Sequence, residues 1–368
     1  MMVRLLILAA VLVAAIGPSA PISAQQESGF SVSFSVIDLG PIEHPDQETC
    51  ADRAPGASVT AIAAGNRAVG SVYVDDDRAV AALFSADGVR KMASGPGGGV
   101  ANAINRENEI AGTVYKLLPD DPCGRPSGAQ PAVWNEKFEL STLDLPDGSR
   151  SGSANAINTD GAVAGWVTTE GGRVAAIWND DQITTLFHAG IDGLDGMRSE
   201  AADVNEAGVV AGNLAWRDDT GDHRRPFVWD GTTVQYLDAG QNRDGYASAL
   251  NDAGVVAGAM INDAGFEQAT LWWRGQLVDL PELPDRPASV ATDINNGGVV
   301  VGYCAREDGL SRATIWIDRQ VVDLNEIIPQ DLGWQLQVAV GINDDGSIAG
   351  WGDLDGETHA FLLVPAAG

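Results

Sequence analysis

The chain has 368 residues, enough for two average domains or one large repetitive domain. Its 22 Lys and Arg against 51 Asp and Glu give a net charge of −29, which repels phosphate, excludes nucleic acid as a partner and disfavours an anionic bilayer surface. Hydrophobic residues make up 45% of the chain, enough for a packed core, so global disorder is excluded as well.

The first 24 residues are typical of a secretory signal peptide. Arg4 supplies the positive start, Leu5 to Ile16 are uniformly apolar, and Gly17-Pro18 leads into small residues ending at Ala24. The apolar stretch is too short for a membrane span, which needs about 20 residues. We therefore predict an exported protein, secreted or periplasmic, that begins near Gln25 and has no membrane span.

A repeat follows the leader: an apolar residue, Asn, two variable residues, Gly, a short apolar run and a second Gly. Seven copies recur about every 47 residues. The residues at the Asn position of the repeat are Ala63, Asn105, Asn158, Asn205, Asn251, Asn295 and Asn343. This spacing predicts a hairpin with a type I turn and a G1 bulge, whose last turn residue needs a positive φ. The two copies without Gly there have Asn66 and Asn108, as that turn allows. We interpret the repeated asparagines as turn residues rather than as a ligand or nucleophile series.

Each hairpin is followed by a small residue, a variable one, an aliphatic one and usually Trp, and then by a fourth strand that often ends in Asp-Leu. The tryptophans of this stripe are Trp134, Trp178, Trp229, Trp272 and Trp316, and we expect them in the core between units. Four strands per unit predict an all-β, seven-bladed β-propeller, with units at about 55–94, 97–145, 150–188, 197–238, 244–281, 287–325 and 335–364. The seventh unit lacks a fourth strand, so we expect the N-terminal strand, 31–40, to complete it, closing a single domain over 25–368.

The last unit resembles the bacterial extracellular HAF repeat family, through His359-Ala360-Phe361 after Ile342-Asn343 and the Gly346 to Gly350 run. Asp38-Leu39-Gly40 is similar to the opening motif of that family. The other six units replace the histidine of the triplet. The resemblance implies an exported repeat protein and supplies no catalytic residues.

Catalytic motifs are sparse. The four histidines, His44, His188, His223 and His359, stand in different units without metal-ligand spacing. No Gly-x-Ser-x-Gly motif occurs. We therefore expect a non-enzymatic binding or scaffold module, a monomer, with a carbohydrate or a protein as ligand. A carbohydrate-processing enzyme and a purely structural envelope protein stay open as alternatives.

The loops between second and third strands are rich in Asp and Glu, and in a propeller they emerge on one face. Asp353, Asp355 and Glu357 come nearest to a calcium loop, so calcium is the one cofactor that the sequence suggests. The alternative is that these acids form tight turns and keep an exported protein soluble.

The residue after the second Gly varies from Ala to Trp, and includes Trp166, Tyr303 and Trp351. With Trp334, these aromatic rings predict a face that stacks on sugars. The alternative is that they fill gaps between blades.

Three cysteines occur in a chain that we expect to be exported. Cys50 and Cys123 fall in loops on the same predicted face of neighbouring blades, whereas Cys304 lies on a strand across the ring. We predict a Cys50–Cys123 disulfide and a free, buried Cys304.

Overall fold

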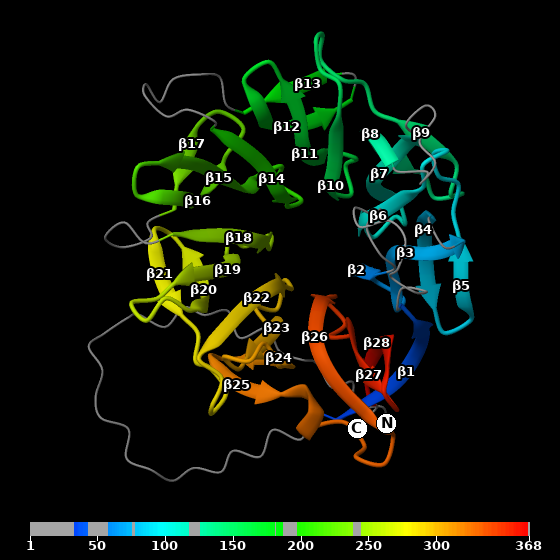
Figure 1. Cartoon of the computed structure of the whole chain (residues 1–368), viewed down its shortest axis with the longest axis vertical. Helices are drawn as coiled ribbons and strands as arrows, with labels where there is room; N and C mark the ends of the chain where they lie inside the picture. The colour runs from blue at the N-terminus through cyan, green and yellow to red at the C-terminus, as the bar shows by residue number, and fades with distance from the viewer. Residues whose placement is uncertain are drawn as a thin grey trace, which may run out of the picture.

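Seven four-stranded antiparallel sheets surround a central axis in the computed structural model, as Figure 1 shows. The structure describes residues 33–42, 58–75, 78–117, 126–180, 182–186, 197–237 and 244–366. The predicted all-β, seven-bladed β-propeller is therefore confirmed. Within the described residues no helix is long and apolar enough to cross a membrane.

Blades one to six each take four consecutive strands, ordered from the centre of the ring outward. Blades one and two hold β2 (Ser58–Ala63), β3 (Arg67–Asp75), β4 (Arg78–Ser85), β5 (Gly88–Lys91), β6 (Gly99–Ile104), β7 (Ile110–Leu117), β8 (Pro126–Trp134) and β9 (Leu140–Thr142). Blades three and four hold β10 (Gly152–Ile157), β11 (Val163–Thr169), β12 (Gly172–Asn179), β13 (Gln182–Thr185), β14 (Arg198–Val204), β15 (Val210–Asp218), β16 (Gly221–Trp229) and β17 (Val234–Tyr236). Blades five and six hold β18 (Gly245–Leu250), β19 (Val256–Ile261), β20 (Glu267–Trp273), β21 (Gln276–Asp279), β22 (Ala288–Ile294), β23 (Val300–Ala305), β24 (Ser311–Ile317) and β25 (Gln320–Asp323), followed by the 3-10 helix η1 (Leu324–Glu326).

Blade seven joins both ends of the chain. It contains β26 (Trp334–Ile342), β27 (Ile348–Leu354), β28 (Glu357–Pro365) and, as its outermost strand, β1 (Phe34–Pro41). Val36 lies opposite Leu363, and Ile37 lies opposite Leu362. The predicted closure by the N-terminal strand is confirmed, and it hides the outer edge of β28 in backbone hydrogen bonds.

In blades two to seven the inner hairpins have one left-handed residue at the end of the turn, as the repeat predicts, whereas in blade one Gly65 is left-handed as well as Asn66. Gly208 and Gly254 have φ of +75° and +77°, and Asn66 and Asn108 take the same left-handed conformation at +58° and +67°. The second glycine of the repeat is required for a different reason. A Cβ on Gly165 would lie 1.9 Å from the Ser153 carbonyl oxygen, so a side chain would clash with the inner strand. A register shift between Ala154 and Ala156 brings the inner strand this close.

Four of the five stripe tryptophans are buried as expected, and Trp229 of blade four is half-buried. Trp134, Trp272 and Trp316 are at most 2% exposed. The indole N–H of Trp134 donates to the Ala93 carbonyl of the preceding blade at 2.7 Å, and that of Trp316 donates to Pro281 at 2.7 Å. These indoles therefore connect the third strands of blades two and six to the end of the blade before each of them.

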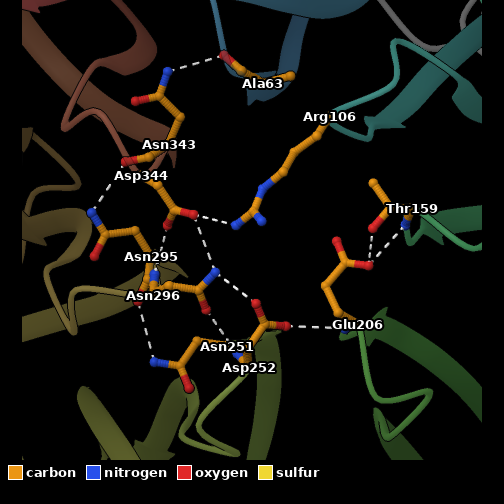
Figure 2. Close-up of polar contacts among 10 residues, drawn as sticks. All are labelled: Ala63, Arg106, Thr159, Glu206, Asn251, Asp252, Asn295, Asn296, Asn343 and Asp344. Atoms are coloured by element: carbon orange, nitrogen blue, oxygen red, sulfur yellow. Dashed lines mark hydrogen bonds and ion pairs between the residues drawn. The ribbon is translucent and has the colours of Figure 1, made fainter.

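The repeated asparagines do more than form turns, as Figure 2 shows for part of the ring. Each side-chain Oδ1 accepts backbone N–H groups of its own turn, as Asn205 does from Ala207 and Val209. Each Nδ2 donates to the backbone carbonyl at the same position in the next blade, at 2.9–3.2 Å. We call this series the amide ladder; its donors are Asn105, Asn158, Asn205, Asn251, Asn295 and Asn343, and its last acceptor is Ala63.

The residues after the ladder asparagines form a second series on the same side of the ring. Asp252 Oδ1 accepts the Glu206 backbone N–H at 3.0 Å, and Asp344 Oδ1 accepts that of Asn296 at 2.9 Å. Arg106 of blade two pairs with Asp344 of blade seven, so the guanidinium reaches past blade one (Figure 2). These contacts hold the blades together on this side of the ring.

Two predictions fall outside the described residues. The signal peptide, 1–24, and the cysteines at 50 and 123 lie there, so cleavage and the disulfide stay predictions. Cys304 is free and fully buried in β23. Burial raises the pKa of its thiol, which keeps it in the unreactive protonated form.

Candidate functional site

A cavity of about 900 Å³ opens among blades two to five. Its walls come from the starts of inner strands such as β14 and β18, the ends of second strands such as β15, and the starts of third strands such as β16. In an antiparallel blade these three ends meet on one side, which is the side away from the Asn-x-x-Gly turns. The cavity therefore lies on the side of the ring opposite the amide ladder.

The lining combines amides, hydroxyls, charged groups and aromatic rings. The polar and aromatic side chains are Asn102, Thr113, Tyr115, Ser153, Asn155, Arg173, Arg198, Ser199, Glu200, Asn213, Trp216, Asp222, His223, Arg224, Asp244, Tyr246 and Glu267. Part of this set also supports the ring. Asn102 donates to the Ala154 carbonyl at 2.7 Å, and Asn155 donates to Ala201 at 2.9 Å, each crossing to the next blade.

His223 lies at the cavity wall between two carboxylates. Its Nδ1 is 3.2 Å from Asp244 Oδ1, and its Nε2 is 3.1 Å from Asp218 Oδ1 and 2.7 Å from the Thr220 hydroxyl. Partial burial lowers the pKa of His223, but Asp244 and Asp218 outweigh that effect and raise it overall. The Trp216 ring stacks on the imidazole at a centroid distance of 5.2 Å. Both ring nitrogens are therefore occupied by protein groups.

Two further contacts define the other walls. The Tyr246 hydroxyl donates to Glu267 Oε1 at 3.0 Å, and burial together with this carboxylate raises the pKa of Tyr246 far above its usual value. Arg173 pairs with Glu200 at 2.9 Å while its guanidinium covers the Trp166 ring at 4.0 Å. The phenol stays protonated at any physiological pH, and the face of Trp166 beneath Arg173 is occupied.

The four aromatic residues that the sequence singles out do not gather at this cavity. Trp166 lies in blade three beneath Arg173, and Tyr303 lies in blade six near Glu267, which together with burial raises the pKa of Tyr303. Trp334 meets His359 and Phe361 edge-on in blade seven, at centroid distances of 6.2 and 5.9 Å. Trp351 is half-buried in β27, opposite Ala360. None of the four lines the cavity, so sugar stacking by these rings stays a prediction.

Trp216, Tyr246 and Tyr115 line the cavity instead, and the sequence analysis missed them. For Tyr246, the sequence did contain a feature from which its place in the cavity could have been predicted. It lies directly opposite Ala259, the smallest residue at the variable repeat position, so a large ring fits across from a small one.

The acidic loop of blade seven has a role in its own turn. Asp353 Oδ1 accepts the Gly356 backbone N–H at 3.0 Å, and Asp355 has a φ of +55°. Within the described ranges, no group of three or more His, Cys, Asp or Glu side chains is arranged to hold a metal ion. Calcium binding by Asp353, Asp355 and Glu357 stays a prediction.

Comparisons with known proteins bear on the fold. No protein-family model matches the sequence, and no curated protein matches it significantly. The chain is similar to a prolyl endopeptidase structure at 11% identity and a TM-score of 0.51, covering 91% of this chain and 51% of that one. It is also similar to virginiamycin B lyase from Staphylococcus aureus (9% identity, TM-score 0.48, 90% of this chain and 99% of that one) and to YCF48 bound to D1 peptide (10%, 0.46, 95% and 100%).

At these identities the likeness shows the fold alone. A propeller fold does not specify a function.

Proposed function

We propose that this protein is an exported, non-enzymatic binding module that holds a carbohydrate in the cavity of blades two to five. The observation that carries the proposal is the lining, in which amides, hydroxyls and charged groups alternate with the rings of Trp216, Tyr246 and Tyr115. Sugar hydroxyls need paired donors and acceptors, and their C–H faces pack on aromatic rings. A cavity of about 900 Å³ has the size of a small-ligand site.

The histidine of the lining fits binding better than general-base catalysis. A general base needs a free nitrogen or oxygen within hydrogen-bond reach of the substrate. Both nitrogens of His223 are taken by Asp244, Asp218 and Thr220. Glu267 accepts the Tyr246 hydroxyl, and the Glu200 carboxylate holds Arg173. These partners suit a preformed site that orients a ligand.

Export rests on the sequence of the first 24 residues, with Arg4 before a twelve-residue apolar stretch. An exported chain meets cell-surface and extracellular polysaccharides, which agrees with a glycan ligand. Mass spectrometry of the protein from the culture medium and the periplasm tests this part, and a mature N-terminus near Gln25 is the expected result.

A glycan array probed with the mature protein tests the binding function. We expect Trp216→Ala and Tyr115→Ala each to weaken binding about tenfold or more, because each removes a cavity ring. Tyr236→Ala is the matched control, since Tyr236 is an exposed ring on β17 of blade four and lies outside the lining. Thermal unfolding of each variant checks the fold. An array on which no glycan binds contradicts the proposal, and release of a shortened sugar favours the enzyme alternative.

A further inference from the structure

Two arginines of blade four form one cross-strand row with an alanine between them. Ala215 of β15 lies directly opposite Arg198 of β14 on one side and opposite Arg224 of β16 on the other. Directly opposed residues of an antiparallel sheet share a face, so all three side chains stand on the same side of blade four. The two arginine backbones are two strand spacings apart, about 9.5 Å. The small alanine leaves the space between the two long side chains open.

All three residues of this row line the cavity, and both arginines are exposed. We call Arg198, Ala215 and Arg224 the arginine row. The ring of Tyr246 lies 6.0 Å from the Arg224 guanidinium, so the row borders an aromatic wall of the same cavity.

The carboxylates of the lining are already matched by other groups. Glu200 pairs with Arg173 at 2.9 Å, and Asp222 pairs with Arg217 at 3.6 Å. Asp244 holds His223, and Glu267 accepts the Tyr246 hydroxyl. Within the described part of the chain, by contrast, neither Arg198 nor Arg224 has an ion-pair partner. The unpaired cations of the cavity wall are therefore these two guanidinium groups, and its unpaired anion is Glu267, which bonds a neutral phenol.

Two unmatched guanidinium groups are notable in a chain with 51 acidic and only 22 basic residues. With this excess of Asp and Glu in the chain, one acidic residue near either arginine would be enough to form an ion pair. A guanidinium binds a carboxylate through two parallel N–H···O bonds, in a geometry that an ammonium group does not reproduce.

We propose that the arginine row selects a carboxylate-bearing sugar, so that the ligand of the cavity is an acidic glycan such as a uronate or sialate oligosaccharide. The carboxylate lies over Ala215 between Arg198 and Arg224, and the sugar rings extend toward Tyr246. This inference rests on the proposed function, because it names the class of glycan that the same cavity takes.

The test compares each acidic glycan with its neutral counterpart. The probes are a galacturonate trisaccharide and a sialyl trisaccharide, each beside its carboxyl-reduced form, with a sulfated trisaccharide as a third anion, all titrated by calorimetry. We expect a carboxylate-bearing probe to bind about tenfold or more tightly than its reduced form, as charge-assisted hydrogen bonds predict. Arg198→Gln/Arg224→Gln removes that difference.

The control is Arg274→Gln/Arg319→Gln, which removes the same charge at two turns between third and fourth strands, away from the cavity. It keeps the preference for the acidic form. Equal binding of acidic and reduced glycans, a preference that survives in Arg198→Gln/Arg224→Gln, or tighter binding of the sulfated probe overturns the acidic-sugar inference while the binding function stands. Binding of no glycan at all on the array overturns the binding function itself.

Discussion

A single asparagine side chain serves both its own turn and the next blade. Asn251 accepts the Ala253 and Val255 backbone N–H groups through Oδ1 and donates to the Asn295 carbonyl at 3.2 Å through Nδ2. The Asn251 side chain is 5% exposed, so its partners lose their hydrogen bonds to water on folding. The side-chain amide replaces those hydrogen bonds. Local turn formation and assembly of the ring therefore depend on the same side chain.

Asn251→Ala measures that dependence. We expect a loss of about 1–3 kcal/mol in the free energy of unfolding, because buried donors and an acceptor are left unpaired. Asn262→Ala is the matched control, since Asn262 accepts the Ala264 and Phe266 N–H groups in the same type of turn but lies in an exposed hairpin of blade five. There we expect about 0.5 kcal/mol. Urea unfolding measures both, and equal losses would mean that the inter-blade bond adds nothing.

Two aspartates give the fold a pH dependence. Asp203 accepts the Leu250 N–H of the next blade, and Asp293 accepts that of Ile342, each at 2.7 Å. Burial raises the pKa of Asp203 to about 7 and that of Asp293 to about 6. The folded state then holds these protons more tightly than the unfolded chain, so stability falls as the pH rises from about 4 to about 7.

Urea unfolding at pH 5 and pH 8 tests this sign, with higher stability expected at pH 5. His223 and His359 also have raised pKa values and add a loss in the same direction above about pH 6.5. We therefore expect Asp203→Asn/Asp293→Asn to reduce the difference between the two pH values rather than abolish it. Asp160→Asn/Asp263→Asn, a pair of exposed turn positions, is expected to leave the difference unchanged. A double variant at 203 and 293 that keeps the full difference would contradict the assignment.

At the scale of strands, β1 holds the two ends of the chain together. Its Phe34 and Leu39 are 4% and 6% exposed and pack with blade seven and its neighbours, and the whole strand pairs with β28. Without β1, the outer edge of β28 is a row of unpaired backbone groups.

Deleting residues 25–41 is expected to give an aggregating product with a lower melting temperature. Deleting residues 25–32 alone leaves β1 in place and is expected to give a monomer. Size-exclusion chromatography and thermal unfolding of both proteins make the comparison. A monomeric, fully stable 25–41 deletion would show that closure by β1 is dispensable.

The hairpins, the blade number and the closure could be predicted from the sequence because they depend on local spacing. A Gly or Asn at the last turn position, as at Gly208 or Asn66, indicates a positive φ at that same residue. The ladder bonds join residues 44 to 53 positions apart, and 280 apart at Ala63, and the cavity joins residues of four blades. These contacts depend on how neighbouring blades are oriented. The sequence therefore identified Asn205 as a turn residue but missed its bond to Asn251. It also missed Trp216, because four blades contribute to the cavity.

The whole molecule carries a net charge of −29, and its exposed loops repel one another. We expect sodium chloride to raise the melting temperature by screening this repulsion, and calcium chloride at equal ionic strength to raise it equally. Differential scanning fluorimetry over both salts is the measurement. A saturable increase at millimolar calcium alone would instead indicate a specific site, with Asp353, Asp355 and Glu357 as the first residues to substitute.

The amide ladder runs in one direction and has two ends. It starts at Asn105 in blade two and finishes on the Ala63 carbonyl in blade one, and Ala63 has no amide with which to reach blade two. Thr60 bonds across that seam to the Ala101 carbonyl, while Arg106 reaches past blade one to Asp344. We therefore expect hydrogen exchange to show the lowest opening free energy at the seam between blades one and two. Backbone amides of β2 and β6 are then expected to exchange with solvent before those of β14 and β18.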